Sequence, residues 1–340
     1  MKHGVLRKNL KAGKLDRCYI LYGEEKFLID YYRREIRTHV MGAEADDFNY
    51  HRMDGSEADI DRLRETMDAY PAFAEHSLIE LRDFDLFSFT DTNAKKLAEL
   101  LKDIPEYCCL LFVYDTLEYK ADKRKKLLCE AVQSCAKEVE CPLQNADDLI
   151  KWIQNRFQSE QKKISRTNAE YLLFLAGNQM NSLANEITKL SFFAETDEIT
   201  HAEIERIVVP AVEAEIFLLT DELAEKHYEA AADLMYRLLQ LNTEPIVLTA
   251  IIGSQLRKLY AARLVKECGG SAAMLKELIN AYSEYLPRQY LKICGNFSID
   301  WYRMAISACC ETDYKLKSSA SDVPADLLWT LFLKLAVKEK

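Results

Sequence analysis

Apolar and polar positions in the first 142 residues follow two periods, one typical of strands and one typical of helices. Short apolar or alternating runs predict strands over 17–22, 48–53, 77–81, 108–114 and 138–141. Helical spacing occurs between them, over 26–40 and 57–69. In the second helix, Ile60, Leu63 and Met67 share one face. Strands that alternate with helices indicate a mostly parallel sheet covered on both faces.

From about residue 143 onward the pattern is helical only. Helices are predicted over 147–160, 168–176, 179–194, a short stretch from Thr200, and then 213–224, 227–241, 245–267, 271–281, 287–294, 298–317 and 324–337. Glu203 follows Thr200 at the spacing of a capping box, which marks a helix start. Pro210 marks a boundary. The fold class is therefore multidomain α/β plus all-α, with domains over 1–142, 143–209 and 210–340.

Composition narrows the function classes. The 340 residues include only 10 Gly and 7 Pro, which favours long helices over turn-rich all-β folds. The net charge of -10 disfavours an independent nucleic-acid binder, because such proteins are usually basic.

Cysteine usage and hydropathy indicate the compartment. The ten cysteines form no C-x-x-C, and some lie in apolar runs, as Cys108 and Cys109 do. We expect small buried hydrophobes in a reducing environment. No signal peptide opens the chain, and no apolar run approaches the roughly 20 residues of a membrane span. A cytoplasmic protein with no membrane partner is expected.

The first strand ends where a phosphate-binding loop could lie. Such a loop needs G-x-x-x-x-G-K-[ST], but after Gly23 the second glycine and the Lys-Ser/Thr pair are absent. Glu24 and Glu25 would repel a polyphosphate. The simpler interpretation is a strand-to-helix turn whose acidic residues stabilise the helix N-terminus.

Two further parts of an ATP site are missing. After the third strand, Arg82-Asp83-Phe84 stands where an ATPase would carry an Asp-Glu pair. The segment 177–181 has no arginine for a nucleotide's phosphates. No catalytic residue, cofactor site or metal site is therefore predicted.

Two segments are candidates for partner contacts. Phe73 lies in a connection before the third strand, where it could anchor a partner or fold back on the core. The run 120–126 is basic, and Lys123, Arg124 and Lys125 could touch a phosphate backbone or form a solvated helix face.

Taken in order, several segments resemble the bacterial DNA polymerase III delta subunit family over nearly the whole chain. They are 19–28, 71–75, 122–127, 139–143, 183–190, 215–221, 244–245, 255–259 and 313–318. The resemblance implies a degenerate AAA+-like module over 1–142, a small helical lid domain and a C-terminal helical collar domain.

The resemblance also implies a function. The first domain would bind the ring-shaped sliding clamp (beta) through a wedge matching Pro71, Ala72, Phe73 and Ala74, and favour an opened interface. The collar would join the ATP-hydrolysing gamma/tau subunits and delta-prime around primed DNA. The chain would then be a non-catalytic subunit of a DNA-directed DNA polymerase holoenzyme.

The wedge departs from the family's usual pattern, which resembles Pro-Leu-Phe-Gly. Ala72 and Ala74 are smaller and bury less apolar surface. Phe73 would carry most of the anchoring, with Leu63, Met67 or Tyr70 as helpers. The competing hypotheses are an active AAA+-type ATPase with an atypical phosphate loop and a helical scaffold or adaptor.

Overall fold

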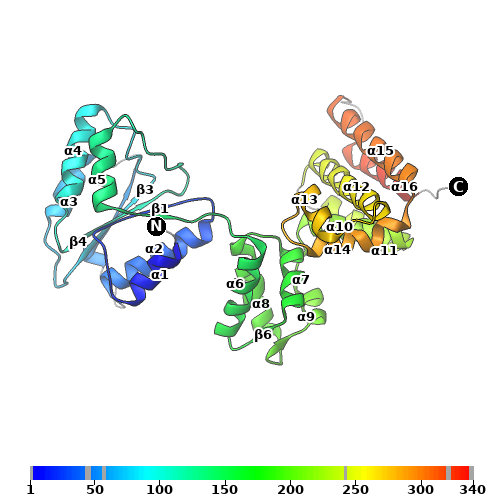
Figure 1. Cartoon of the computed structure of the whole chain (residues 1–340), viewed down its shortest axis with the longest axis horizontal. Helices are drawn as coiled ribbons and strands as arrows, with labels where there is room; N and C mark the ends of the chain where they lie inside the picture. Colours follow the sequence, from blue (N-terminus) through cyan, green and yellow to red (C-terminus); the bar gives the residue numbers. More distant parts are fainter. Residues whose placement is uncertain (1–2, 43–46, 56–58, 241–242, 319–322, 337–340) are drawn as a thin grey trace. The chain divides into compact units, whose positions relative to one another are not determined.

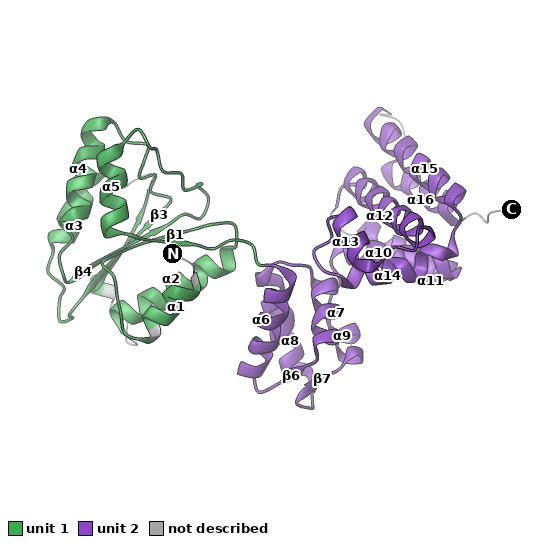
Figure 2. Cartoon of the chain, viewed as in Figure 1, with its two compact units in different colours: residues 1–144 green, residues 145–340 purple. Residues whose placement is uncertain are grey.

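The chain folds into two compact units. The computed structural model describes residues 3–42, 47–55, 59–240, 243–318 and 323–336. Unit 1 spans 1–144 and unit 2 spans 145–340 (Figure 1, Figure 2). The further division of the second part at residue 209 stays a prediction.

Within the described part of unit 1, five strands form one parallel sheet in the order β2-β3-β4-β1-β5. The strands are β1 (Cys18–Tyr22), β2 (Tyr50–Asp54), β3 (Ser77–Arg82), β4 (Cys108–Val113) and β5 (Lys137–Glu140). The helices are α1 (His3–Lys11), α2 (Lys26–Met41), the 3-10 helix η1 (Asp47–Asn49), α3 (Ile60–Asp68), α4 (Asp91–Lys102) and α5 (Lys126–Cys135). The predicted parallel sheet is confirmed.

Both faces of this sheet are covered, as predicted. Alternate residues of the central strands, such as Ile79 and Leu110, share a core with Leu63 of α3, Leu97 of α4 and Val132 of α5. The other face packs against α2, while α1 contacts α2 and β5 (Figure 1). The strand period of two therefore sorts side chains into two cores.

One charge lies inside the sheet, on the side that faces α2. Glu80 of β3 is fully buried and accepts hydrogen bonds from the Tyr50 hydroxyl at 2.7 Å and Arg82 Nε at 2.9 Å. Arg33 of α2 reaches it at 3.4 Å. Burial raises the pKa of Glu80, but these partners outweigh it and the net shift is downward. An ionised carboxylate therefore links α2 to the sheet.

In its described residues, unit 2 consists of helices and one pair of short strands. Its helices are α6 (Ala146–Ser159), α7 (Arg166–Ala176), α8 (Met180–Phe193), α9 (His201–Ile207), α10 (Val212–Glu225), α11 (Tyr228–Gln240), α12 (Pro245–Glu267), α13 (Ala272–Leu278), α14 (Tyr285–Ile293), the 3-10 helix η2 (Cys294–Asn296), α15 (Ile299–Ser318) and α16 (Pro324–Ala336). The strands β6 (Lys163–Ile164) and β7 (Glu198–Ile199) pair in parallel. The expectation of helices only from residue 143 is wrong at these strands.

Local signals set several ends of these helices. The capping box predicted at Thr200 is confirmed, because the backbone N–H of Glu203 donates to the Thr200 hydroxyl and the Glu203 carboxylate accepts from the Thr200 N–H. Pro245 stands at the first turn of α12, where its missing N–H costs nothing. The helix α12 packs on α15, and Tyr290 of α14 donates a buried hydrogen bond to Gln255 of α12 at 2.6 Å.

Most cysteines are buried or half-buried, as expected from the sequence. All ten lie in described ranges and are free thiols. Cys268 and Cys310 are exposed, whereas the others are buried or half-buried, so the expectation of buried hydrophobes is wrong at these two. Among the described residues, no helix combines the length and apolar character needed to cross a bilayer.

Candidate functional site

A short loop at the amino end of β3 carries the most exposed aromatic side chain of unit 1. Residues 69–76 join α3 to β3, and Phe73 is 108% exposed. The alternative that Phe73 folds back on the core is therefore wrong. Pro71 is half-buried, and Ala72 and Ala74 are exposed. We call residues 70–74 the edge loop.

The backbone of the edge loop is held by a buried side chain from another segment. Asn49, only 2% exposed, donates from Nδ2 to the Ala72 carbonyl at 2.8 Å and accepts from the Ala72 N–H at 2.7 Å. A carboxamide can make both bonds at once because it carries a donor and an acceptor side by side. Asn49 immediately precedes β2, so it ties the edge loop to the neighbouring strand of the sheet.

Phe73 itself has a left-handed backbone, with φ of 56°. For a bulky residue this conformation costs roughly 1–2 kcal/mol and persists only where the surroundings impose it. The two bonds from Asn49 to the preceding residue supply such a constraint. These bonds hold the backbone beside Phe73, whose ring lies on the outside of the protein.

Two further exposed aromatic side chains, Tyr70 and Phe48, lie in or next to the segments joined at the edge loop. Tyr70 is 83% exposed and its ring lies 4.7 Å from that of Tyr107, centroid to centroid. Phe48, which precedes Asn49, is 79% exposed. Phe48 and Asn49 were not predicted as site residues, because their closeness to Ala72 depends on the pairing of β2 with β3 and leaves no local signal in the sequence.

The neighbours expected to help Phe73 differ in accessibility. Leu63 and Met67 are fully buried in the core under α3. Neither can reach a partner without unfolding that helix. Of the three helpers named from sequence, only Tyr70 is on the surface.

At the opposite, carboxyl edge of the sheet, the β1–α2 turn is closed by its own residues. Glu25 caps α2, accepting from the Phe27 N–H at 3.2 Å, and its backbone N–H donates to the Cys141 carbonyl. Burial raises the pKa of Glu25. Lys26 donates to the Asp115 carbonyl. The helix N-terminus that would receive a phosphate thus carries a carboxylate instead.

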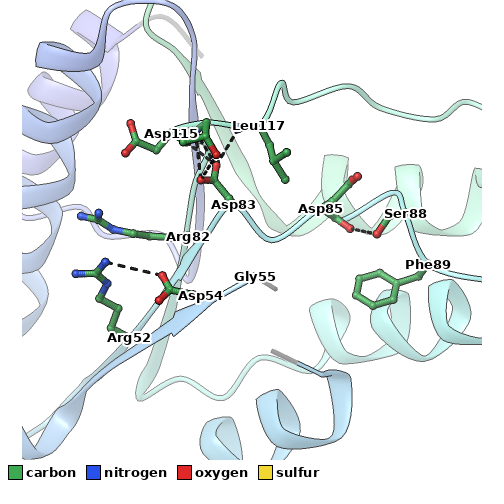
Figure 3. Close-up of a pocket in the computed structure, with 11 residues that line it drawn as sticks. Arg52, Asp54, Gly55, Arg82, Asp83, Asp85, Ser88, Phe89, Asp115 and Leu117 are labelled. Carbon is green, nitrogen blue, oxygen red and sulfur yellow. Dashed lines mark hydrogen bonds and ion pairs between the residues drawn. The ribbon is translucent and has the colours of Figure 1, made fainter. Parts of the chain in front are cut away.

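Asp83, in the place of an ATPase's metal-binding pair, is also used internally. Its carboxylate accepts from the backbone N–H groups of Asp115, Thr116 and Leu117 at 2.8–3.0 Å and from the Thr116 hydroxyl at 2.7 Å (Figure 3). Partial burial raises the pKa of Asp83, but these bonds outweigh it and the net pKa is lowered. The carboxylate locks the loop that follows β4.

A cavity of about 590 Å³ opens beside Asp83 (Figure 3). Its charged lining consists of Arg52, Asp54, Arg82, Asp83, Asp85 and Asp115. Four carboxylates against two guanidinium groups make it a poor receptor for a polyphosphate. Within the described residues, no group of three or more His, Cys, Asp or Glu side chains is arranged to hold a metal ion.

The basic segment before α5 is only partly available. Lys123 and Arg124 are exposed, and Arg124 pairs with Asp122 at 3.0 Å. Lys125 is half-buried and its ammonium group donates to the carbonyls of Phe87 and Phe89. As candidates for a phosphate contact, Lys123 and Arg124 therefore remain better placed than Lys125.

Comparisons with known proteins point in one direction. Family models described as "DNA polymerase III, delta subunit" and "DNA polymerase III delta subunit, C-terminal domain" match residues 19–142 and 213–334. The DNA polymerase III subunit delta of Bacillus subtilis is 27% identical, covering 97% of this chain and 96% of that protein. The solved structure of the Bacillus subtilis DNA clamp loader delta protein is 26% identical with a TM-score of 0.59, covering 98% and 99%.

Proposed function

The chain belongs to the DNA polymerase III delta subunit family, and from this membership and the geometry of the edge loop we propose that it binds and opens a sliding clamp. Its fold is the expected AAA+-like parallel-sheet unit followed by helices. The observation that carries the proposal is Phe73, a fully exposed ring on a constrained left-handed backbone. An exposed aromatic anchor of this kind is typical of interface hot spots.

Opening a ring requires more than binding it. A ligand shifts an equilibrium only by its differential affinity for the two states, so the edge loop must bind the opened clamp more tightly than the closed one. Burying the Phe73 ring contributes roughly 1.5–3 kcal/mol of hydrophobic free energy. A rigid wedge directs that free energy to whichever clamp conformation presents the matching pocket.

We propose a non-catalytic role for the chain within the polymerase holoenzyme, in the cytoplasm. Glu25 caps the helix where phosphate would bind, and Asp83 is occupied by backbone N–H groups, which supports this role. Unit 2 would join the ATP-hydrolysing subunits and delta-prime, and Lys123 and Arg124 would lie near primed DNA. The active-ATPase alternative has no feature of the site in its favour.

The deciding experiment is equilibrium binding of the purified chain to the sliding clamp of the same organism, with ATP absent. Phe73→Ala should weaken binding by about 2 kcal/mol, roughly 30-fold, the size expected of an anchor residue. The matched control is Phe192→Ala, because Phe192 is also 87% exposed but lies on α8 of unit 2. Its affinity should stay within about threefold of wild type.

Three results would contradict the proposal. They are absence of wild-type binding at micromolar concentrations, equal affinity of wild type and Phe73→Ala, and a strict requirement for ATP. The last would mean that the wedge is not already formed in the isolated chain.

A further inference from the structure

The exposed aromatic surface around Phe73 extends beyond the wedge of residues 71–74. Three exposed aromatic side chains, Phe48, Tyr70 and Phe73, come from two chain segments at the amino edge of the sheet. The double hydrogen bond between Asn49 and Ala72 joins these segments, and Phe48 and Phe73 are the residues next to the bonded pair. Grouped exposed aromatics at a fixed backbone are typical of the core of a protein interface.

We propose that Phe48, Tyr70 and Phe73 form one three-ring contact surface and that Asn49 is its positioning residue. The inference rests on the proposed clamp-binding function. It explains how the chain could bind the clamp although position 72 carries the small side chain of alanine. The two extra rings supply the apolar area that Ala72 lacks, since each aromatic side chain buries 150–250 Å² as an order of magnitude.

The charge near the surface defines the partner further. Residues 65–76 contain three carboxylates, Glu65, Asp68 and Glu75, and no lysine or arginine. All three carboxylate side chains are exposed. The matching site on the clamp is therefore an apolar pocket with a basic rim, and association should slow as salt is added.

Asn49 acts before binding. Its side chain is buried and makes both bonds to the backbone of Ala72, so it touches no partner. Without these bonds the backbone beside Phe73 loses a constraint that favours its left-handed conformation. The binding-competent fraction of molecules would fall, and the apparent affinity would fall with it.

The test is a double-mutant cycle in the full chain, measured as clamp affinity. Asn49→Ala should weaken binding about tenfold in the wild-type background, from the loss of two hydrogen bonds that favour the bound form. In the Phe73→Ala background it should weaken binding by less than about twofold, because there is no ring left to position. The thermal midpoint should fall by the same amount in both backgrounds.

A merely structural Asn49 would lower affinity equally in both backgrounds, and that result would overturn the positioning role, as would an unchanged affinity. If Asn49→Ala does not fold, Asn49→Asp replaces it in both backgrounds. The carboxylate keeps the acceptor for the Ala72 N–H but loses the donor to the Ala72 carbonyl.

The two flanking rings are tested separately. Tyr70→Ala and Phe48→Ala should each weaken binding at least about fivefold. Tyr314→Ala, a tyrosine 72% exposed on α15 of unit 2, should match wild type. If Phe73→Ala weakens binding but Tyr70→Ala and Phe48→Ala do not, the three-ring surface is wrong and clamp binding stands. If Phe73→Ala also has no effect, the edge loop is not the contact, and if the wild type itself does not bind the clamp, the proposed function fails.

Discussion

At the residue scale, Phe73 shows how an unfavourable conformation can be maintained for binding. The chain places a bulky residue at a positive φ, where glycine would fit without strain. A glycine there would also leave the loop free to move. Phe73 thus lowers the stability of the folded chain while it presents a fully exposed ring to a partner.

Asp83 also has a positive φ, of 49°. Unlike Phe73, it uses its side chain for hydrogen bonds within the protein. Its Oδ1 accepts from three backbone N–H groups, and its Oδ2 accepts from the N–H and hydroxyl of Thr116. Asp83→Asn should destabilise the protein by about 2 kcal/mol at pH 7, because it removes the charge and replaces Oδ2 with an NH2 group that can only donate. Urea unfolding measures this. Asp115→Asn is the control, since Asp115 is an exposed aspartate beside the same cavity.

The difference in unfolding free energy between wild type and Asp83→Asn should depend on pH in a defined direction. The folded-state pKa of Asp83 is lowered, so its contribution to stability is complete above the unfolded pKa of roughly 4 and is lost as pH falls through the folded value. The gap between wild type and Asp83→Asn should shrink below about pH 4. A gap that stays constant down to pH 2 would show that the charge is not involved.

At the scale of elements, the β1–α2 turn depends on one glycine. Gly23 has φ of 133°, and a Cβ there would lie 2.3 Å from the Cys141 carbonyl oxygen. Gly23→Ala should therefore destabilise unit 1 by about 3 kcal/mol or more, from strain and overlap together. Denaturant unfolding of the full chain measures the effect.

Gly177→Ala separates the cost of backbone strain from the cost of atomic overlap. Gly177 also has a positive φ, of 78°, but a Cβ there meets nothing within 4 Å. Its ψ of -175° lies in a backbone region nearly exclusive to glycine, so Gly177→Ala should cost the strain alone, about 1–3 kcal/mol, and less than Gly23→Ala. Equal losses at Gly23 and Gly177 would mean that the close approach of Cys141 to the turn does not affect stability.

The elements that sequence predicted well are those with enough residues to show a period. The range predicted for α12, 245–267, matches the structure at both ends, because Pro245 fixes its start and apolar spacing continues to its end. The pair β6 and β7 has two residues per strand, so no alternation can appear. Its pairing of Lys163 with Glu198 is set by the packing of α6 to α9 around it.

The candidate site divides in the same way. The edge loop could be located from the sequence because residues 71–75 resemble a motif of the family. Its hydrogen bonds to Asn49 could not, since 23 residues separate Asn49 from Ala72. The exposure of individual side chains could not be predicted either. Leu63, Met67 and Tyr70 are all large apolar or aromatic residues near Phe73 in the sequence, but only Tyr70 is exposed.

At the scale of the whole molecule, the residues proposed to bind the clamp all belong to unit 1, which spans 1–144. A fragment of residues 1–144 contains the complete sheet and both of its cores, so it should fold and bind the clamp within about threefold of the full chain. Circular dichroism and the same binding assay test this. A folded fragment that does not bind would place an essential contact in unit 2.

The strand β3 has a consequence for how the molecule could relay a signal. It starts four residues after Phe73 and ends next to Asp83, so its six residues, about 20 Å, connect the two edges of the sheet directly. Hydrogen bonds to β2 and β4 on either side prevent it from stretching or bending alone. A displacement at Asp83 could therefore reach residues 70–74 only if β3 moved together with β2 and β4, because sliding alone would break both sets of hydrogen bonds.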